Sequence, residues 1–236
     1  MATPGPYYTI EDIRGLFSKP SFSSLFMVHM PIGESPTGLS GAFSDADLYN
    51  TNRNGYRLEE RVSLLCTDAT LPGSTFNTVE VKGHRQGIIE RYANYRIYPN
   101  IDFSFLVDQD HTNIRLFETW MNYINPLEGD QNDTNSYFKM EYPDDYVLDF
   151  FITKFEKNDN HFNNELDLES SRKTVYKFLR GYPTNIASMP VSYEGTSLIK
   201  ATITFQYDRY TVTSFEPGDY PDFLEEFDDP RISLPL

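Results

Sequence analysis

Cysteine is almost absent from this sequence, because Cys66 is the only one among 236 residues. A single cysteine excludes disulfides within the chain and every zinc or iron–sulfur site that needs several thiolates. The four histidines, His29, His84, His111 and His161, are scattered without the spacing of metal ligands. We therefore expect no metal and no cofactor. Cys66 ends an apolar run, which is typical of a buried small side chain rather than a nucleophile.

Basic residues are also scarce. The chain has 20 Lys and Arg against 35 Asp and Glu, a formal net charge of -15 at pH 7. Tight nucleic-acid binding is not expected, because it requires cations that displace counterions from phosphates. The tyrosines at 92, 95 and 98 are accordingly expected to pack in a core or an interface rather than to stack on bases. Apolar runs are far shorter than the roughly 20 residues of a spanning helix, so we expect no membrane insertion.

Aromatic residues and alternating patterns, in contrast, are abundant. The chain contains 17 Tyr and 18 Phe, and a clear two-residue period over 101–107 and 198–210 predicts half-buried strands. Apolar residues at helical spacing predict one helix over 114–124, ended by Pro126, and a short N-terminal helix over 9–19. Further strands are predicted over 24–30, 61–67, 76–81, 88–98, 136–140, 147–155, 175–179 and 188–193.

These elements predict a mainly β fold, an antiparallel sandwich or half-barrel with one docked helix and a short N-terminal helix. We expect one β domain over 1–213, with a long surface loop over 31–58 and a polar loop over 158–171. Residues 214–236 form an acidic C-terminal extension with seven acidic residues and one basic residue. Its aromatic residues are predicted to contact a neighbouring subunit: Phe215, Tyr220, Phe223 and Phe227.

No motif with catalytic spacing is present: there is no Gly-rich phosphate loop, no paired-histidine zinc motif and no nucleophile elbow. The adjacent carboxylates Asp144-Asp145 and Glu225-Glu226 are read as surface acids, since strand neighbours point to opposite faces. We expect a protein that is not an enzyme. Two alternatives remain open: a cell-wall glycosidase that uses two converging carboxylates, and a carbohydrate-binding β-sandwich module with surface tyrosines.

Several segments, taken in order, resemble the tail tube proteins of contractile-tailed bacteriophages, a family that includes the baseplate proteins on which the tube is nucleated. The matching segments are Phe22 and Leu25-Phe26 before the first strand, 66–73 (CTDATLPG), the strand 101–107 with the helix 115–120 after it, 181–186 (GYPTNI), and the final strand through Phe205 and Tyr207. The loop 31–58 and the extension 214–236 are longer than a minimal tube subunit needs. They suit either a major tube subunit or a baseplate-proximal tube initiator.

The resemblance implies a structural virion protein that closes into a homo-hexameric ring. Such rings stack into a tube inside a contractile sheath, contact sheath and baseplate proteins, and form the conduit for DNA ejection. The implied location is the virion tail, assembled in the host cytoplasm, and viral DNA passes without specific binding. Luminal acids would repel DNA over about 8 Å at physiological salt. The candidate lumen-lining residues are Asp102, Ser104, Asp108, Lys200, Thr202, Thr204, Gln206 and Asp208.

Overall fold

The structure is a computed structural model that describes residues 21, 23–46, 48, 58–84, 87–126, 139–156, 172–191, 193 and 198–216. The chain divides into two compact units. The larger contains Met27–Thr153 and Val175–Thr213, and the smaller contains Met1–Phe26, Lys154–Thr174 and Ser214–Leu236.

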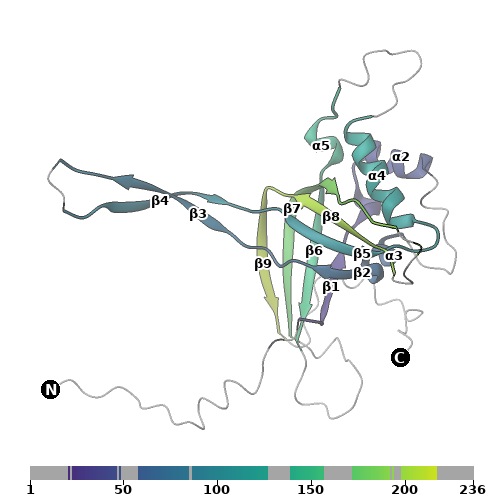
Figure 1. Ribbon diagram of the computed structural model, residues 1–236, viewed down its shortest axis with the longest axis horizontal. Coiled ribbons are helices and arrows are strands. Elements are labelled where there is room, and N and C mark those ends of the chain that lie inside the picture. Colours follow the sequence, from purple (N-terminus) through teal and green to yellow (C-terminus); the bar gives the residue numbers. More distant parts are fainter. Residues whose placement is uncertain are drawn as a thin grey trace, which may run out of the picture. The chain divides into compact units, whose positions relative to one another are not determined.

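The principal feature of the fold is a seven-stranded sheet (Figure 1). Its order is β1-β6-β7-β8-β5-β2, and β9 also pairs with β7. The strands are β1 (Phe26–His29), β2 (Cys66–Ala69), β5 (Ile101–Leu106), β6 (Leu148–Phe155), β7 (Lys173–Ile186), β8 (Lys200–Gln206) and β9 (Arg209–Phe215). The ladders β2–β5, β5–β8 and β7–β8 are antiparallel, so the predicted antiparallel, mainly β fold is confirmed. The sheet is open and bent, as in a half-barrel, rather than split into two stacked sheets.

The core lies between the sheet and helix α4 (Thr112–Ile124). On β5 and β8 the apolar members of the alternation are fully buried, and their rings meet those of α4. Phe105 and Phe205 lie 5.3 and 5.8 Å from the ring of Phe117, and the indole of Trp120 donates a 2.8 Å hydrogen bond to the Tyr146 carbonyl. Burying one such side chain stabilises the fold by roughly 1.5–3 kcal/mol. The predicted helix over 114–124 is therefore confirmed, and it is the main cover of this sheet face.

Two helical regions differ from the sequence-based prediction. The expected loop over 31–58 contains the 3-10 turn η1 (Ile32–Glu34) and helix α2 (Thr37–Asp45). Phe43 of α2 is completely buried, and its ring lies 6.1 Å from that of Trp120. The loop prediction is wrong here because it rested on the small and polar residues around Phe43. Helix α3 (Leu58–Leu65) occupies most of the predicted strand 61–67, because Leu58 and Val62 fall on one helical face and are buried.

The last predicted strand, 198–210, is divided into β8 and β9, and the division coincides with a bend in β7. Arg180 in β7 has a positive φ of 57°. Its backbone N–H donates to Asp149 (2.9 Å), and its guanidinium contacts Asp144 (2.7 Å) and Asp208 (3.1 Å). The residue after it, Gly181, lies directly on the ring of Phe150. The left-handed residue, held by three carboxylates, lets the sheet curve at this point.

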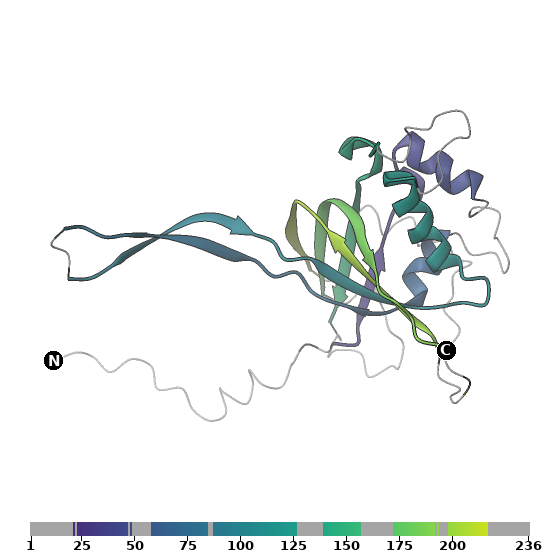
Figure 2. The same cartoon turned by 45° about the horizontal axis from the view of Figure 1, so that its top comes forward.

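Strands β3 (Thr75–Val81) and β4 (Glu90–Ile97) form a separate two-stranded sheet, which we call the arm. The arm continues the β2–β5 ladder outward, as Figure 2 shows. That ladder ends where the Thr70 N–H donates to Asp102, and prolines at 72 and 99 interrupt both chains before the arm begins. Tyr98 anchors the base of the arm, since its ring lies 5.6 Å from that of Tyr210.

The smaller unit joins three chain segments through short backbone and side-chain contacts. The N–H of Phe155 donates to Leu25 and that of Glu156 to Arg172, each at 3.0 Å. The side chain of Arg172 lies 3.3 Å from Glu216. These contacts join the described parts of all three segments.

The remaining predictions over short segments have mixed outcomes. Helix α5 (Pro143–Tyr146) was not predicted. The described parts of 136–140 and 188–193 contain no strand, so these two strand predictions are wrong there. The N-terminal helix over 9–19, the polar loop over 158–171 and the extension beyond residue 216 lie outside the described residues.

The contact between Gly181 and Phe150 leads to a stability prediction. A Cβ at position 181 would overlap the buried Phe150 ring, so Gly181→Ala should reduce the free energy of unfolding by about 1–3 kcal/mol. Gly41→Ala, at an exposed position of α2, is the matched control, because its Cβ meets nothing within 4 Å, and it should be neutral or stabilising by up to about 1 kcal/mol. Urea denaturation of both variants tests this; equal effects would contradict it.

Buried His29 leads to a prediction about acid stability. It is 3% exposed, its ring lies 5.9 Å from that of Phe151, and burial lowers its pKa from 6.5 to about 4. The unfolded chain therefore binds the proton more readily, so stability falls as the pH drops between these two values, by about 3 kcal/mol in total. Urea midpoints measured from pH 7.5 to 4.5 should fall less steeply in His29→Gln, whereas exposed His84→Gln should retain the wild-type slope.

Candidate functional site: a polar sheet face and an uncovered arm

The polar members of the β5 and β8 alternation form one continuous face. The register pairs Asp102 with Thr204 and Ser104 with Thr202. Each pair is also joined through its side chains, at 2.7 Å for Thr204 Oγ1 to Asp102 Oδ1 and at 3.1 Å between the hydroxyls of Ser104 and Thr202. All four side chains are half-buried or exposed, whereas their neighbours on each strand are buried against α4. Two strands nearly 100 residues apart in the chain thus contribute to one hydroxyl-rich surface.

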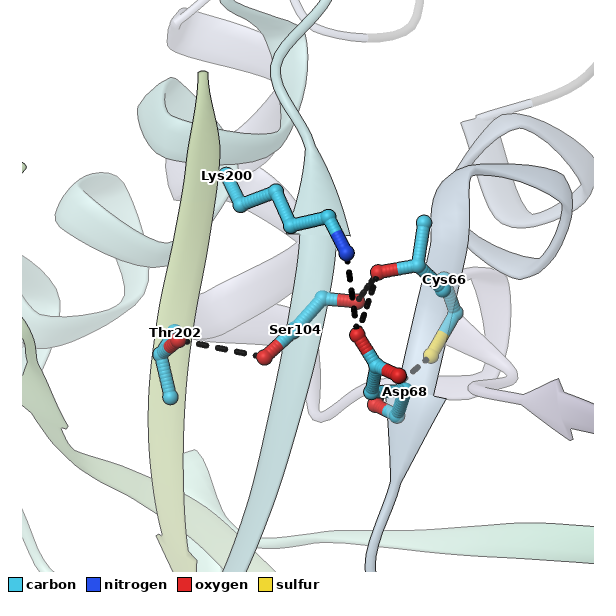
Figure 3. A network of polar contacts seen from close by, with 6 residues as sticks. Cys66, Asp68, Ser104, Lys200 and Thr202 are labelled. Carbon is cyan, nitrogen blue, oxygen red and sulfur yellow. Dashed lines mark hydrogen bonds and ion pairs between the residues drawn. The ribbon is translucent and has the colours of Figure 1, made fainter. Parts of the chain in front are cut away.

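Strand β2 extends this surface, as Figure 3 shows. The ammonium of Lys200 lies 3.2 Å from Asp68 Oδ2, and the Thr67 hydroxyl donates to the same oxygen at 2.9 Å. These contacts, first the Thr67 hydrogen bond and then Lys200, lower the pKa of Asp68. Cys66 donates from Sγ to the Asp68 carbonyl at 3.6 Å, and burial raises its pKa to about 12. The thiol is therefore protonated at neutral pH, consistent with the prediction that it is not a nucleophile.

We define the polar face by the six side chains that share this side of the β2–β5–β8 ladder with the candidates from the sequence. They are Asp68, Asp102, Ser104, Lys200, Thr202 and Thr204. Five of these were among the predicted lumen-lining residues, and Asp68 was not. The position of Asp68 on this face could be inferred only from its neighbours Cys66 and Thr67, because four-residue β2 is too short to show an alternation.

Three other lumen candidates lie apart from this cluster or at its margin. Asp108 lies 2.6 Å from Arg61 of α3 and accepts the Thr112 N–H at 2.7 Å. It therefore caps the N-terminus of α4 on the helix-covered side of the sheet. Asp208 is held at the bend by Arg180. Gln206 ends β8, where its amide donates to the Tyr207 carbonyl.

The arm presents the second unusual surface. The β3–β4 register places four apolar residues of the arm on one side, which also carries Glu90 opposite Val81, and the four are 42–55% exposed: Val79, Val81, Tyr92 and Ile97. The opposite side carries Glu80, which pairs with Arg91 at 3.1 Å, and Phe76, which is 52% exposed and lies 4.8 Å below the Arg96 guanidinium. The predicted packing role of the tyrosines at 92 and 95 is thus not met within the chain, where each is 55% exposed.

No set of three or more His, Cys, Asp or Glu in the described part of the chain could hold a metal ion. Asp144 lies in exposed α5, where it contacts Arg180, and Glu225 and Glu226 lie outside the described residues. No described helix has the length and apolar character needed to cross a membrane.

A family model for phage tail tube proteins matches residues 21–213, most of the chain. The chain belongs to this family. The resemblance inferred from the sequence is therefore confirmed at the level of the tail tube family. The matched residues include nearly all of the bent antiparallel sheet. No curated protein matches this chain significantly.

Solved structures of contractile injection systems are also similar. The anti-feeding prophage baseplate, 6-fold symmetrised, matches with 9% identity and a TM-score of 0.49, covering 83% of this chain and 97% of that chain. The sheath-tube complex of the extracellular contractile injection system PVC in the extended state matches with 12% identity and a TM-score of 0.48, covering 86% and 97%. The crystal structure of an Hcp protein matches with 11% identity and a TM-score of 0.39, covering 81% and 99%.

The predicted contact residues of the acidic extension are mostly outside the described residues. Phe215 is the last residue of β9 and is half-buried, while Tyr220, Phe223 and Phe227 lie beyond residue 216. Their contact with a neighbouring subunit stays a prediction.

Proposed function

We propose that this tail tube family member is a non-catalytic structural subunit that closes into a homo-hexameric ring of the tube through which DNA leaves the virion. The observation that carries the proposal is the arm, whose apolar side is uncovered. A two-stranded hairpin is marginally stable alone in water, and contiguous exposed apolar surface typically marks an interface. Identical neighbouring subunits supply that cover at every arm in a closed ring or stack.

The open strand edges favour the same assembly. Among the described strands of the main sheet, β1 and β2, of four residues each, lie at the ends of the strand order, and β9, of seven residues, pairs with β7 alone. Unpaired backbone groups at such edges are satisfied when another strand joins them. Closing the sheets of neighbouring copies around an axis pairs such edges, which an isolated subunit cannot do.

Charge also favours contact between copies. Between residues 75 and 97 the arm has four basic and two acidic residues, although the whole chain carries -15. Because the arm is basic, it is attracted to the acidic body of the next copy. The rest of this acidic chain would instead be repelled by that body. The arm is therefore the part of the molecule best suited to reach a second copy.

The polar face then lines the lumen. Its hydroxyls and two carboxylates make most of the surface that a passing duplex would meet, beside half-buried Leu106, and its one cation is ion-paired. Such a wall holds DNA weakly and without sequence preference, as a conduit requires. In this proposal rings stack within the sheath, contact baseplate proteins and assemble in the host cytoplasm, as either the major tube subunit or the tube initiator, and the aromatic residues of 214–236 contact a neighbouring subunit.

Disrupting the apolar side of the arm should block assembly without unfolding the subunit. The double substitution Val79→Ser and Tyr92→Ser removes roughly 2 kcal/mol of apolar burial per arm, so the concentration needed for assembly should rise at least about tenfold. Thr78→Ser with Ala93→Ser, on the opposite side of the same hairpin, is the matched control. Sedimentation and negative-stain microscopy measure assembly, and circular dichroism checks folding; rings at the wild-type concentration from the first variant would contradict the proposal.

Chemical labelling tests the position of the polar face. In a Cys66→Ala background, Thr202→Cys should react with a small maleimide in both dissociated and assembled protein, but with a bulky polymer-linked maleimide only when dissociated. Glu118→Cys on the exposed side of α4 controls for reactivity. Rapid bulky labelling of Thr202→Cys in intact tubes would place the face outside the lumen.

A further inference from the structure

The polar face contains a single cation, Lys200, on a surface that the proposed function requires to be non-adhesive. An isolated lysine facing a DNA duplex can replace a counterion at a phosphate, which adds a salt-dependent contact. In a stacked tube that contact would be repeated in every subunit and would slow a passing duplex. The arrangement around Lys200 therefore determines how smoothly the face can transmit a polyanion.

Lys200 does not point freely into solvent (Figure 3). Its ammonium lies 3.2 Å from Asp68 Oδ2, although the two side chains are 52% and 67% exposed. Thr67 donates to the same carboxylate oxygen at 2.9 Å and is itself 3.2 Å from the Ser104 carbonyl. The hydroxyl thus contacts the same oxygen as Lys200 and also lies within hydrogen-bond distance of β5. Exposed Asp68 is therefore held by contacts to residues of β2 and β8.

We propose that Asp68 is a specificity-determining residue that masks the Lys200 ammonium and so prevents this strand face from binding the phosphates of DNA. The inference rests on the proposed luminal position of the face. An exposed ion pair contributes little to folding stability, so the pair's role is to set the charge that the face presents. Asp102, the other acid on the face, is bonded to Thr204 rather than to a cation, and it has no such masking role.

The two acids provide an isosteric comparison. Asp68→Asn and Asp102→Asn each remove one negative charge and keep a hydrogen-bond acceptor, but only the first leaves Lys200 unpaired. Binding of a fluorescent 20-base-pair DNA duplex to the purified full-length chain would be followed by anisotropy, at protein concentrations below assembly and over a tenfold range of salt. The basic arm contributes equally in all variants.

We expect Asp68→Asn to bind the duplex more tightly than wild type at low salt, and its advantage to fall about eightfold over the tenfold rise in salt, as for one additional phosphate contact. Asp102→Asn should show a much smaller change. Adding Lys200→Gln to Asp68→Asn should abolish the gain. Equal gains from the two single variants would overturn the proposal, since net charge alone would then explain them.

Asp68→Asn combined with Lys200→Gln is also an independent check, because it removes the whole ion pair without changing the net charge. Because the paired ammonium is already masked, this double variant should bind the duplex as wild type does, within about twofold, whereas a clear loss of affinity relative to wild type would overturn the proposal. Labelling of Thr202→Cys in intact tubes distinguishes a failure of the luminal assignment from a failure of the masking proposal. If the bulky maleimide labels intact tubes rapidly, the face does not meet the DNA, but the masking result on the isolated chain still holds.

Discussion

The two-residue alternation along the paired strands β5 and β8 is the constraint on which the rest of the structure depends. Since adjacent side chains on a strand point to opposite faces, the aromatic residues that pack beneath α4 force Asp102, Ser104, Thr202 and Thr204 to the other side. A slip of one residue in this ladder would exchange the two faces completely. The apolar core and the polar face are thus two results of one register.

The bend at Arg180 lies in β7, the strand that pairs with β8 on the side opposite β5. A positive φ at a residue other than glycine is unfavourable, and here it is stabilised by contacts with Asp144, Asp149 and Asp208 from three different parts of the chain. The close approach of Gly181 to Phe150 permits β7 to continue through the bend. A curved open sheet with short edge strands is suited to completion by other copies, which connects this local backbone geometry with assembly of a tube.

Much of the fold could be predicted from local pattern. The helix over 114–124 and the strand at 101–107 follow from clear periodicity, and the strands at 76–81 and 88–98 from the turn residues that bound them; the structure contains a helix or strand at each place. The predictions failed where local and tertiary signals conflict: α3 contains most of a short apolar run that resembles a strand, and Gly- and Ser-rich α2 is stabilised largely by burying Phe43 against Trp120. Helix propensity is a weak prior that tertiary packing overrides.

The sequence by itself determined the class of the protein and the chemistry of its surfaces: an acidic, aromatic-rich, antiparallel chain with polar residues at every second position of its best strands. Only the tertiary structure decided which of those residues meet. In the structure, Asp68 of β2 lies beside Lys200 of β8, and Asp108 caps α4 instead of joining the polar face. The tyrosines at 92 and 95 in the arm are exposed. The physical reason is that alternation defines the face of a residue within its own strand, whereas strand order and register, which arise from contacts distant in sequence, define its neighbours.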